Sequence, residues 1–504
     1  MHGAAFLGYY GNLARPYAVG VSSDRSLGVG MAMAVADGGS PFNHVQIEFG
    51  NLEPMWTYTV AALSGFSSTR TPLVYDNMTW LVLALTALGF YRAWSLPAAG
   101  EDPDVARWRG VLVAASTLGL SSMALAPDGA LAPFWQANFV FKPNHAIAFG
   151  LVGLVSRFQA ARDSWWKLGL VLGLLMWAFI LDWAYALPAL AISALLGPRP
   201  LDELKKVAAA IALSLTLGAP YLVHLLKDYN PMGKGEMPQI WRDSMGDRLT
   251  NPYWWSLDYG PLLALFLIGL VVAFRRGARG DREERGALGF LLTAPIVGLS
   301  YVIGLRFGFA PEPDEGFYYV RMVLAAGAGY AAWELAPRFA RGSRPRFALA
   351  FAAVLAGSLP GHFNPNLEDR YYRHSLYPIP APALAVSAWL RANTTVRDVC
   401  VSAEGIMLSG LSGRRFLMVR PEQTADRRAR EEAERDILTS RDEAVVRRAA
   451  TRYGVTHIVL DDRLREAYGP EAVKGLGNRG WFEPMFANSF ARIVALRPAG
   501  RLRE

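Results

Sequence analysis

Acidic and basic side chains gather in five segments that precede or separate long apolar runs. A carboxylate there could take a proton from an attacking hydroxyl or amine, and an arginine could hold a phosphate through two parallel hydrogen bonds. The segments are residues 22–72, residues 127–145, the turn at Asp182, residues 227–259 and residues 310–322, the last of which is bracketed by Arg306 and Arg321. Their candidate site residues are Asp24, Glu53, Lys142, His145, Asp182, Arg306, Glu312, Asp314, Glu315 and Arg321.

Each of these side chains also has a simpler interpretation. Asp24 could be an ordinary loop carboxylate, and the acids at 312–315 could belong to a solvated loop. Arg306 and Arg321 could anchor to lipid headgroups rather than grip the phosphate of a bound lipid. Asp182 could only cap the helix that follows it, although an acid at the border of a bilayer is costly and favours a functional role.

The composition shows which elements must position these residues. The chain has 504 residues, of which 52% are hydrophobic and 19% charged, whereas a soluble domain carries about 25% charged residues. Apolar residues are concentrated in 73–360 and charged residues in 361–504. This composition excludes disordered and collagen-like chains, and the single cysteine, Cys400, excludes an intramolecular disulfide and a cysteine-based zinc cluster.

A bilayer core of about 30 Å needs about 20 apolar helical residues, and the chain offers ten candidate segments. They are residues 73–92, 109–126, 145–157, 167–181, 184–196, 207–226, 260–274, 287–305, 321–337 and 346–360. Residues 167–196 form one apolar stretch, and we expect it to turn back at Leu181-Asp182-Trp183.

The loops between these segments alternate in charge. One set holds 18 lysines and arginines and the other holds 6, so the first set is expected in the cytoplasm. All five of the segments named above then face the outside, as do residues 361–504. The net charge of +8 therefore indicates membrane orientation and not a nucleic-acid partner.

Residues 1–72 are expected outside the cytoplasm as well, unless a span precedes them. Residues 1–21 show no signal-peptide pattern, so they are either a degenerate first span or the start of a chain that begins downstream of it. Residues 54–66 are apolar but short, which favours an interfacial helix on the outer membrane face.

Strands alternate with helices in residues 361–504, which predicts a small α/β domain. Strands are expected at 398–403, 415–419 and 455–460, with a hairpin over 482–497, and helices at 383–392, 404–412 and 425–453. The charged run 426–435 is either a solvated helix face with a Glu431–Arg435 pair or a surface for a polyanion or lipid. Ser440 and Glu443 have the spacing of a capping box.

One sequence stretch resembles a known family. Asp24 is followed by RSLGVGMAMAVADGGSPFN and then FGNLEPMWTYTVAALSGFSSTR, which is an acid, an Ala/Gly-rich helix, a Gly-Gly turn and a Glu-Pro-aromatic helix. This pattern and the layout of nearly the whole chain resemble the GT-C superfamily of integral-membrane glycosyltransferases. Protein O-mannosyltransferases, aminoarabinose transferases and oligosaccharyltransferase catalytic subunits belong to it.

The resemblance implies a fold, an activity and a site. The fold is a mostly α, polytopic bundle of about 10–11 spans with an extracytoplasmic α/β domain. The activity is transfer of a sugar from a polyprenyl-phosphate donor, at the cell membrane, to a lipid, glycan or protein acceptor. Asp24 and Glu53 would be catalytic carboxylates, while Arg306, Arg321 and Lys142, or a divalent metal such as Mg²⁺ or Mn²⁺, would bind the donor phosphate.

Two departures from the family pattern bear on these roles. The family often has paired acids at the first position, where this chain has Ser23-Asp24-Arg25, and the preceding span is weak or missing. Two other functions therefore stay open, namely a non-catalytic multi-pass protein of glycan assembly or export, and a transporter. A transporter should show intramembrane charges and inverted repeats, and the segments here are nearly free of charge apart from Asp182.

Overall fold

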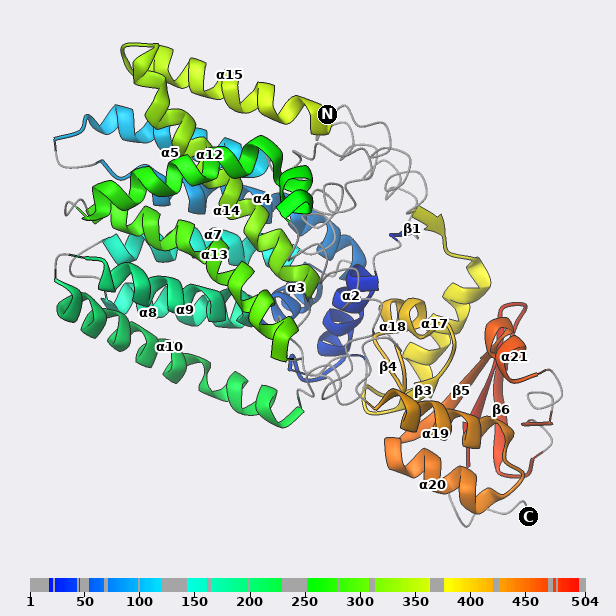
Figure 1. Cartoon of the computed structure of the whole chain (residues 1–504). Coiled ribbons are helices and arrows are strands. Elements are labelled where there is room, and N and C mark those ends of the chain that lie inside the picture. Colours follow the sequence, from blue (N-terminus) through cyan, green and yellow to red (C-terminus); the bar gives the residue numbers. More distant parts are fainter. Residues whose placement is uncertain are drawn as a thin grey trace. The chain divides into compact units, whose positions relative to one another are not determined.

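The computed structural model of the chain is mostly helical (Figure 1). It separates into two compact units, each described here by itself. The helical unit consists mainly of residues 77–222 and 235–371, and the mixed unit of residues 2–76, 223–234 and 372–504. The structure describes residues 18–20, 23–42, 45, 54–67, 71–97, 100–119, 143–160, 165–197, 199–228, 252–278, 282–307, 313–362, 376–419, 426–469, 475–476 and 479–497.

All ten apolar segments overlap helices, as the hydropathy pattern predicts. The helices are α4 (Thr71–Trp94), α5 (Pro103–Gly119), α7 (Pro143–Ala160), α8 (Trp165–Ala178), α9 (Ile180–Leu195), α10 (Pro200–Asp228), α12 (Pro252–Ala278), α13 (Arg282–Phe307), α14 (Pro313–Leu335) and α15 (Ser343–His362). Within the described part of the chain, Pro200–Leu226 alone has both the length and the hydropathy of a membrane span. The existence of ten helices is confirmed, whereas ten membrane crossings stay a prediction.

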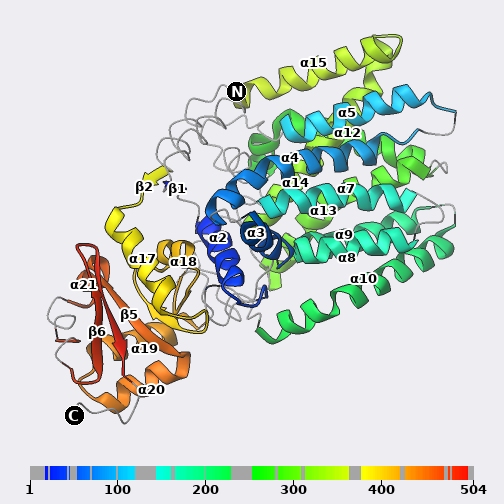
Figure 2. The same cartoon turned by 180° about the vertical axis from the view of Figure 1, so that it is seen from behind.

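Glycines let neighbouring helices of the helical unit approach closely. A Cβ added to Gly169 of α8 would lie 2.8 Å from the Leu213 side chain of α10, and one added to Gly173 would lie 3.0 Å from that of Leu217. Both contacts advance by four residues along each helix, so α8 and α10 run parallel. They lie side by side in Figures 1 and 2.

Helix α9 reverses the direction of α8 after a single extended residue. Phe179 has φ −164° and ψ 109°, and Trp183 Nε1 then donates to Ser214 Oγ on α10 at 3.3 Å. The break therefore comes at Phe179, and the predicted turn at Leu181-Asp182-Trp183 is wrong by about two residues. Hydropathy could not locate it, because Phe179 is as apolar as the helices on both sides of it.

The mixed unit contains a five-stranded sheet with strand order β4-β3-β5-β7-β6. Strands β4, β3 and β5 pair in parallel, and β7 pairs antiparallel with both β5 and β6. The strands are β3 (Val399–Val401), β4 (Arg415–Phe416), β5 (Val455–Asp461), β6 (Phe482–Ala487) and β7 (Ala491–Leu496). The helices around the sheet are α17 (Ala381–Asn393), α18 (Gly405–Ser412), α19 (Arg427–Thr439), α20 (Glu443–Tyr453) and α21 (Asp462–Tyr468).

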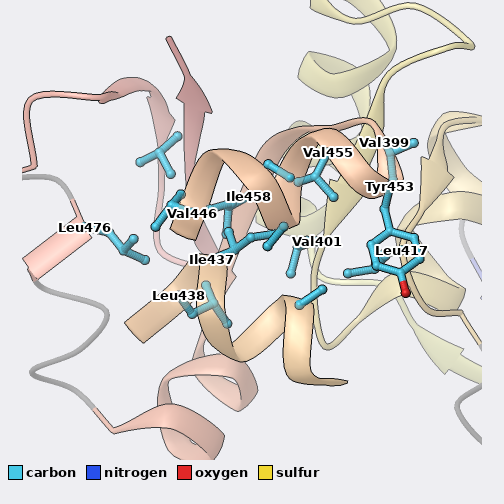
Figure 3. Close-up of a cluster of buried hydrophobic side chains, with 14 of the residues drawn as sticks. Val399, Val401, Leu417, Ile437, Leu438, Val446, Tyr453, Val455, Ile458 and Leu476 are labelled. Atoms are coloured by element: carbon cyan, nitrogen blue, oxygen red, sulfur yellow. The ribbon is translucent and has the colours of Figure 1, made fainter. Parts of the chain in front are cut away.

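Alternating residues on the strands face two different cores, since side chains in a strand alternate between its faces. Val399, Val401 and Ile458 pack in one buried cluster with residues of α19 and α20, such as Ile437 and Val446 (Figure 3). Cys400 and Val459 lie in a second buried cluster on the other face, with residues of α17 and α18.

Two details of the charged helices differ from the expectation. Asp442, and not Ser440, caps α20, because the Asp442 carboxylate accepts a hydrogen bond from the Ala444 amide at 2.8 Å. Ser440 instead ends α19. Glu431 pairs with Arg427, four residues before it, at 2.6 Å, whereas the sequence analysis predicts a pair with Arg435.

Candidate functional site

The predicted catalytic acids lie at or next to helix N-termini. Asp24 is the second residue of α2 (Ser23–Ala36), and Glu53 directly precedes α3 (Pro54–Ser67) but lies outside the described residues. Both helices belong to the mixed unit, like the sheet.

Helix α2 packs against α18 at nearly backbone distance. A Cβ added to Gly30 would lie 2.6 Å from the Ser409 carbonyl oxygen, so only glycine fits there. Leu27 and Met31, on the same face of α2, are 5% and 3% exposed and belong to the buried cluster around Cys400. The segment that carries Asp24 is thus part of the core of the mixed unit.

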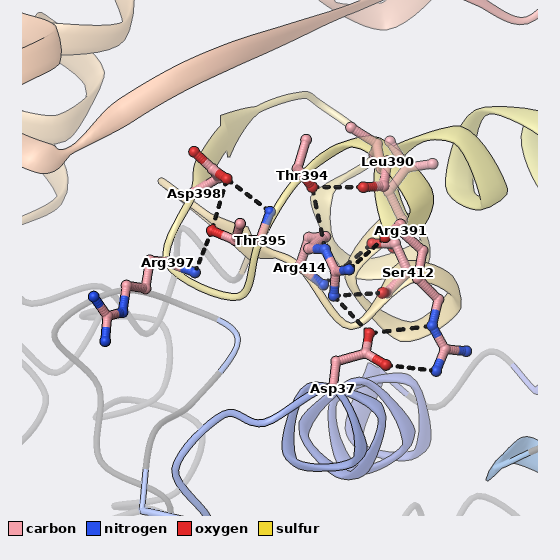
Figure 4. A network of polar contacts seen from close by, with 10 residues as sticks. Asp37, Leu390, Arg391, Thr394, Thr395, Arg397, Asp398, Ser412 and Arg414 are labelled. Carbon is pink, nitrogen blue, oxygen red and sulfur yellow. Dashed lines mark hydrogen bonds and ion pairs between the residues drawn. The ribbon is translucent and has the colours of Figure 1, made fainter.

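A network of charged side chains contacts the chain at the C-terminal end of α2 (Figure 4). Asp37, directly after the helix, accepts hydrogen bonds from Arg391 at 2.8 and 3.1 Å and from Arg414 Nη1 at 2.8 Å. Arg414 is 3% exposed, and its Nε donates to Thr394 Oγ1 at 3.1 Å. Partial burial alone would raise the pKa of Asp37, but the two guanidiniums lower it below its usual value.

This network could not be predicted from the sequence. Asp37 stands next to the Gly38-Gly39 turn, where Gly38 has a φ of +89°, and that turn is the local signal in the sequence. Its partners follow more than 350 residues later, at separations of 354 and 377 residues. No local pattern links residues so far apart.

Helix α3 is apolar on both of its faces. Trp56 and Val60 are buried, and Trp56 packs edge-on against Tyr75 at 5.8 Å between ring centroids. Away from this buried face, Tyr58 is 61% and Phe66 93% exposed. An apolar helix with one such face left open is suited to the membrane interface, as predicted for residues 54–66.

Basic residues from separate loops meet at one end of the helical unit. Arg157 Nη1 donates to the Arg92 carbonyl oxygen at 2.6 Å, and Lys206 Nζ donates to the Gln159 carbonyl oxygen at 3.2 Å. Arg92, Arg157 and Lys206 all belong to the loop set with the excess of basic residues.

Three further arginines of that set belong to the same end. Glu334 accepts hydrogen bonds from Arg276 at 2.5 Å and from Arg346 at 3.3 Å. Arg346 interacts electrostatically with Arg109, whose Nε donates to the Trp94 carbonyl oxygen at the end of α4 at 3.0 Å. These contacts therefore bring together loops of the basic set, which the charge pattern predicts on one side of the membrane.

Helix directions place several predicted site residues at the opposite end. A Cβ added to Gly289, in the first third of α13, would touch side chains in the last turns of α7 and α9. Helix α13 is therefore antiparallel to both, and its penultimate residue, Arg306, lies at the end where α7 begins with His145 in its first turn. Asp182, in the first turn of α9, lies at this end as well.

Helix α14 starts at this end of the helical unit too. It runs parallel to α12, since Gly269 and Arg276 of α12 contact Gly327 and Glu334 of α14. Its first turn contains Asp314 and Glu315, and Arg321 follows roughly 9 Å further along the helix axis. Lys142 and Glu312, like Glu53, lie outside the described residues.

The simpler interpretation of Asp182 as a helix cap is wrong. The N-cap of α9 is Phe179, and no side chain caps the helix there. Asp182 is 2% exposed and lies three residues beyond the cap. A carboxylate so deeply buried needs a reason other than capping.

The described residues give no site for a divalent metal. Among them, no group of three or more histidine, cysteine, aspartate or glutamate side chains is arranged to hold an ion.

Solved structures of glycosyltransferases are similar in fold. ArnT from Cupriavidus metallidurans, bound to undecaprenyl phosphate, matches with a TM-score of 0.52 at 11% identity, covering 98% of this chain and 96% of that one. The mycobacterial arabinofuranosyltransferase AftD matches with a TM-score of 0.53 at 13% identity, covering 99% of this chain but 41% of AftD. No family model and no curated protein matches the sequence. This chain is therefore similar in fold to ArnT and AftD.

Proposed function

We propose that this chain is a multi-pass glycosyltransferase of the cell membrane, which moves a sugar from a polyprenyl phosphate to an acceptor outside the cytoplasm. The observation that carries the proposal is the match to ArnT over nearly the full length of both chains, because that structure holds undecaprenyl phosphate. The agreement between loop charge and the grouping of Arg92, Arg157 and Lys206 at one helical end supports the orientation.

In the proposed reaction, the acceptor hydroxyl or amine attacks C1 of the sugar. The bond between C1 and the phosphate oxygen breaks, and the polyprenyl phosphate leaves with the electron pair of that bond. Asp24 takes the acceptor proton, and Glu53 orients the acceptor. Arg306, Arg321 and Lys142 stabilise the charge on the leaving phosphate. The polyprenyl chain stays in the bilayer, so the reaction has to occur at the membrane surface.

The decisive experiment compares Asp24→Asn with wild type in membranes supplied with a panel of radiolabelled polyprenyl-phosphate sugars. Loss of a carboxylate base should lower transfer by roughly 100-fold or more. The matched control is Asp462→Asn, because the Asp462 side chain is 74% exposed and forms only a surface pair with Arg465. Equal transfer by Asp24→Asn and wild type would reject Asp24 as the base. If the wild-type protein consumes no donor of the panel, the alternative of a non-catalytic protein of glycan assembly or export is favoured.

A further inference from the structure

Helix α2 is a weak helix by its sequence. It contains Gly28 and Gly30 in its interior, and each glycine disfavours a helix by about 1 kcal/mol relative to alanine. A helix of 14 residues is also near the limit of stability on its own. Its position therefore depends on what it packs against, namely α18 along one face and the arginines at its end.

Asp37 does not stabilise α2 by itself. It directly follows the last residue of the helix, where the negative end of the dipole repels a carboxylate. Its role is explained by its partners, since Arg391 lies in the last turn of α17 and Arg414 follows α18 by two residues. Guanidiniums are favourable at those two helix C-termini, and the Asp37 carboxylate joins them to α2.

The network is rigid at its centre. All three side-chain nitrogens of Arg414 donate hydrogen bonds. Nε binds Thr394, Nη1 binds Asp37 and the Ser412 carbonyl oxygen, and Nη2 binds the Arg391 carbonyl oxygen at 2.5 Å. The Arg414 side chain is 4% exposed, so it cannot move without losing these bonds at a site where little water can replace them. Asp37 is thus held at a fixed place against the C-terminal part of the chain.

We infer that Asp37, Arg391 and Arg414 are positioning residues, which orient the catalytic carboxylate of Asp24 through the rigid body of α2. This inference rests on the proposed function. Asp24 lies 13 positions before Asp37, which is roughly 20 Å along a helix. A small tilt at the Asp37 end is therefore magnified at the Asp24 end. A displacement of about 1 Å at a reacting group can cost about 100-fold in rate.

The first test measures turnover in Asp37→Asn, which keeps the shape of the side chain but removes its charge. The matched control is Asp426→Asn, because Asp426 pairs with Arg430 in a similar setting, with the aspartates 22% and 30% and the arginines 4% and 3% exposed. Both variants leave a buried arginine without its carboxylate. Only Asp37→Asn should lower kcat, by roughly tenfold or more, with the KM for donor and acceptor within about twofold of wild type.

The second test follows the geometry without using activity. Cysteines that replace Asp24 and Arg463 carry spin labels, and the distance between the labels is measured by pulsed electron paramagnetic resonance in lipid nanodiscs. The native Cys400 is buried and does not interfere. The distance distribution should be narrow with the native network, broad or shifted with Asp37→Asn and unchanged with Asp426→Asn.

The outcomes separate the two proposals. If wild type transfers no sugar but Asp37→Asn broadens the distance distribution, the function is wrong and the positioning of α2 by the network stands. If Asp37→Asn and Asp426→Asn lower kcat equally, or if the distribution stays narrow in Asp37→Asn, the network contributes only to stability and the inference is overturned.

Discussion

The guanidinium of Arg157 donates a hydrogen bond to the main-chain carbonyl of Arg92, 65 residues earlier in the chain. The contact brings together the C-terminal ends of α4 and α7, so these two helices run in the same direction. Both arginines belong to loops whose charge predicts a cytoplasmic location. The charge of the loops and the contact between the Arg157 side chain and the Arg92 carbonyl oxygen therefore place both loops at the same end of the helical unit.

The orientation can be tested by labelling single cysteines in intact cells with a membrane-impermeant maleimide. A cysteine at Asp102, in the loop after α4, should react only after the cells are opened, whereas one at Glu466, in α21, should react in intact cells. The native Cys400 should stay silent, because burial raises its pKa to about 12 and removes it from solvent. Labelling of both positions in intact cells would contradict the proposed topology.

The docking of α2 on α18 predicts opposite effects for two glycine-to-alanine changes. Gly30→Ala would place a methyl group 2.6 Å from the Ser409 carbonyl oxygen, and a backbone atom cannot easily give way. We expect a loss of about 1–3 kcal/mol in the free energy of unfolding. Gly65→Ala, in α3, meets nothing within 4 Å and should raise stability by up to about 1 kcal/mol.

Thermal unfolding of the purified protein in detergent would measure both glycine variants. The midpoint should fall for Gly30→Ala and rise slightly for Gly65→Ala. If Gly30→Ala were as stable as wild type, the close approach of α2 and α18 would be incorrect.

Glu434 predicts a pH dependence of stability. Its side chain is nearly buried, and burial raises its pKa to about 7, although the hydroxyl of Tyr468, 2.9 Å away, lowers it in part. An acid whose pKa is raised by folding favours the folded state when protonated. Its contribution is therefore complete below about pH 4.5 and is lost as the pH rises through about 7.

Glu434→Gln removes this dependence while keeping an acceptor for Tyr468. Relative to wild type, the variant should gain on the order of 3 kcal/mol between pH 5 and pH 8. Unfolding midpoints at the two pH values measure the difference. Glu432→Gln, on the exposed side of the same helix, serves as the control and should follow wild type at both pH values. Parallel behaviour of the Glu434 variant and wild type would show that the buried carboxyl group does not titrate in this range.

The open face of α3 predicts contact with lipid. An environment-sensitive fluorophore on Phe66→Cys should be quenched by nitroxide-labelled lipids in proteoliposomes, because Phe66 is 93% exposed on an apolar face. The same fluorophore on Glu432→Cys, on a charged helix face, should not be quenched. Quenching of neither position would place α3 away from the bilayer.

Hydropathy and charge were sufficient to predict the ten helices and the grouping of their loops. They were also sufficient for most elements of the mixed unit, because strands such as Val455–Asp461 and helices such as Glu443–Tyr453 have distinct residue patterns. The cap of α20 was misassigned because Ser440 and Asp442 both have side chains that favour an N-cap, and only the backbone geometry distinguishes them.

The partners of α2 could not be predicted in the same way. The close contact of Gly30 with Ser409 and the pairing of Asp37 with Arg414 join residues on helices that belong to opposite ends of the sequence. Such contacts depend on how the chain returns after the ten helices, and neither helical nor strand periodicity carries that information. The strand pairing of Ala18–Gly20 with Leu376–Pro378 was missed for the same reason.

The packing of α2 against α18 also has a consequence for the making of the protein. During translation α2 leaves the ribosome before α18, and the residues that hold it follow roughly 370 positions later, which at about 5–20 residues per second takes on the order of half a minute. A truncated or half-synthesised chain therefore has the segment with Asp24 but lacks the surface that orders it. Synthesis beyond Arg414 thus becomes a condition for an ordered α2, and α2 should stay unordered in fragments that end before this residue.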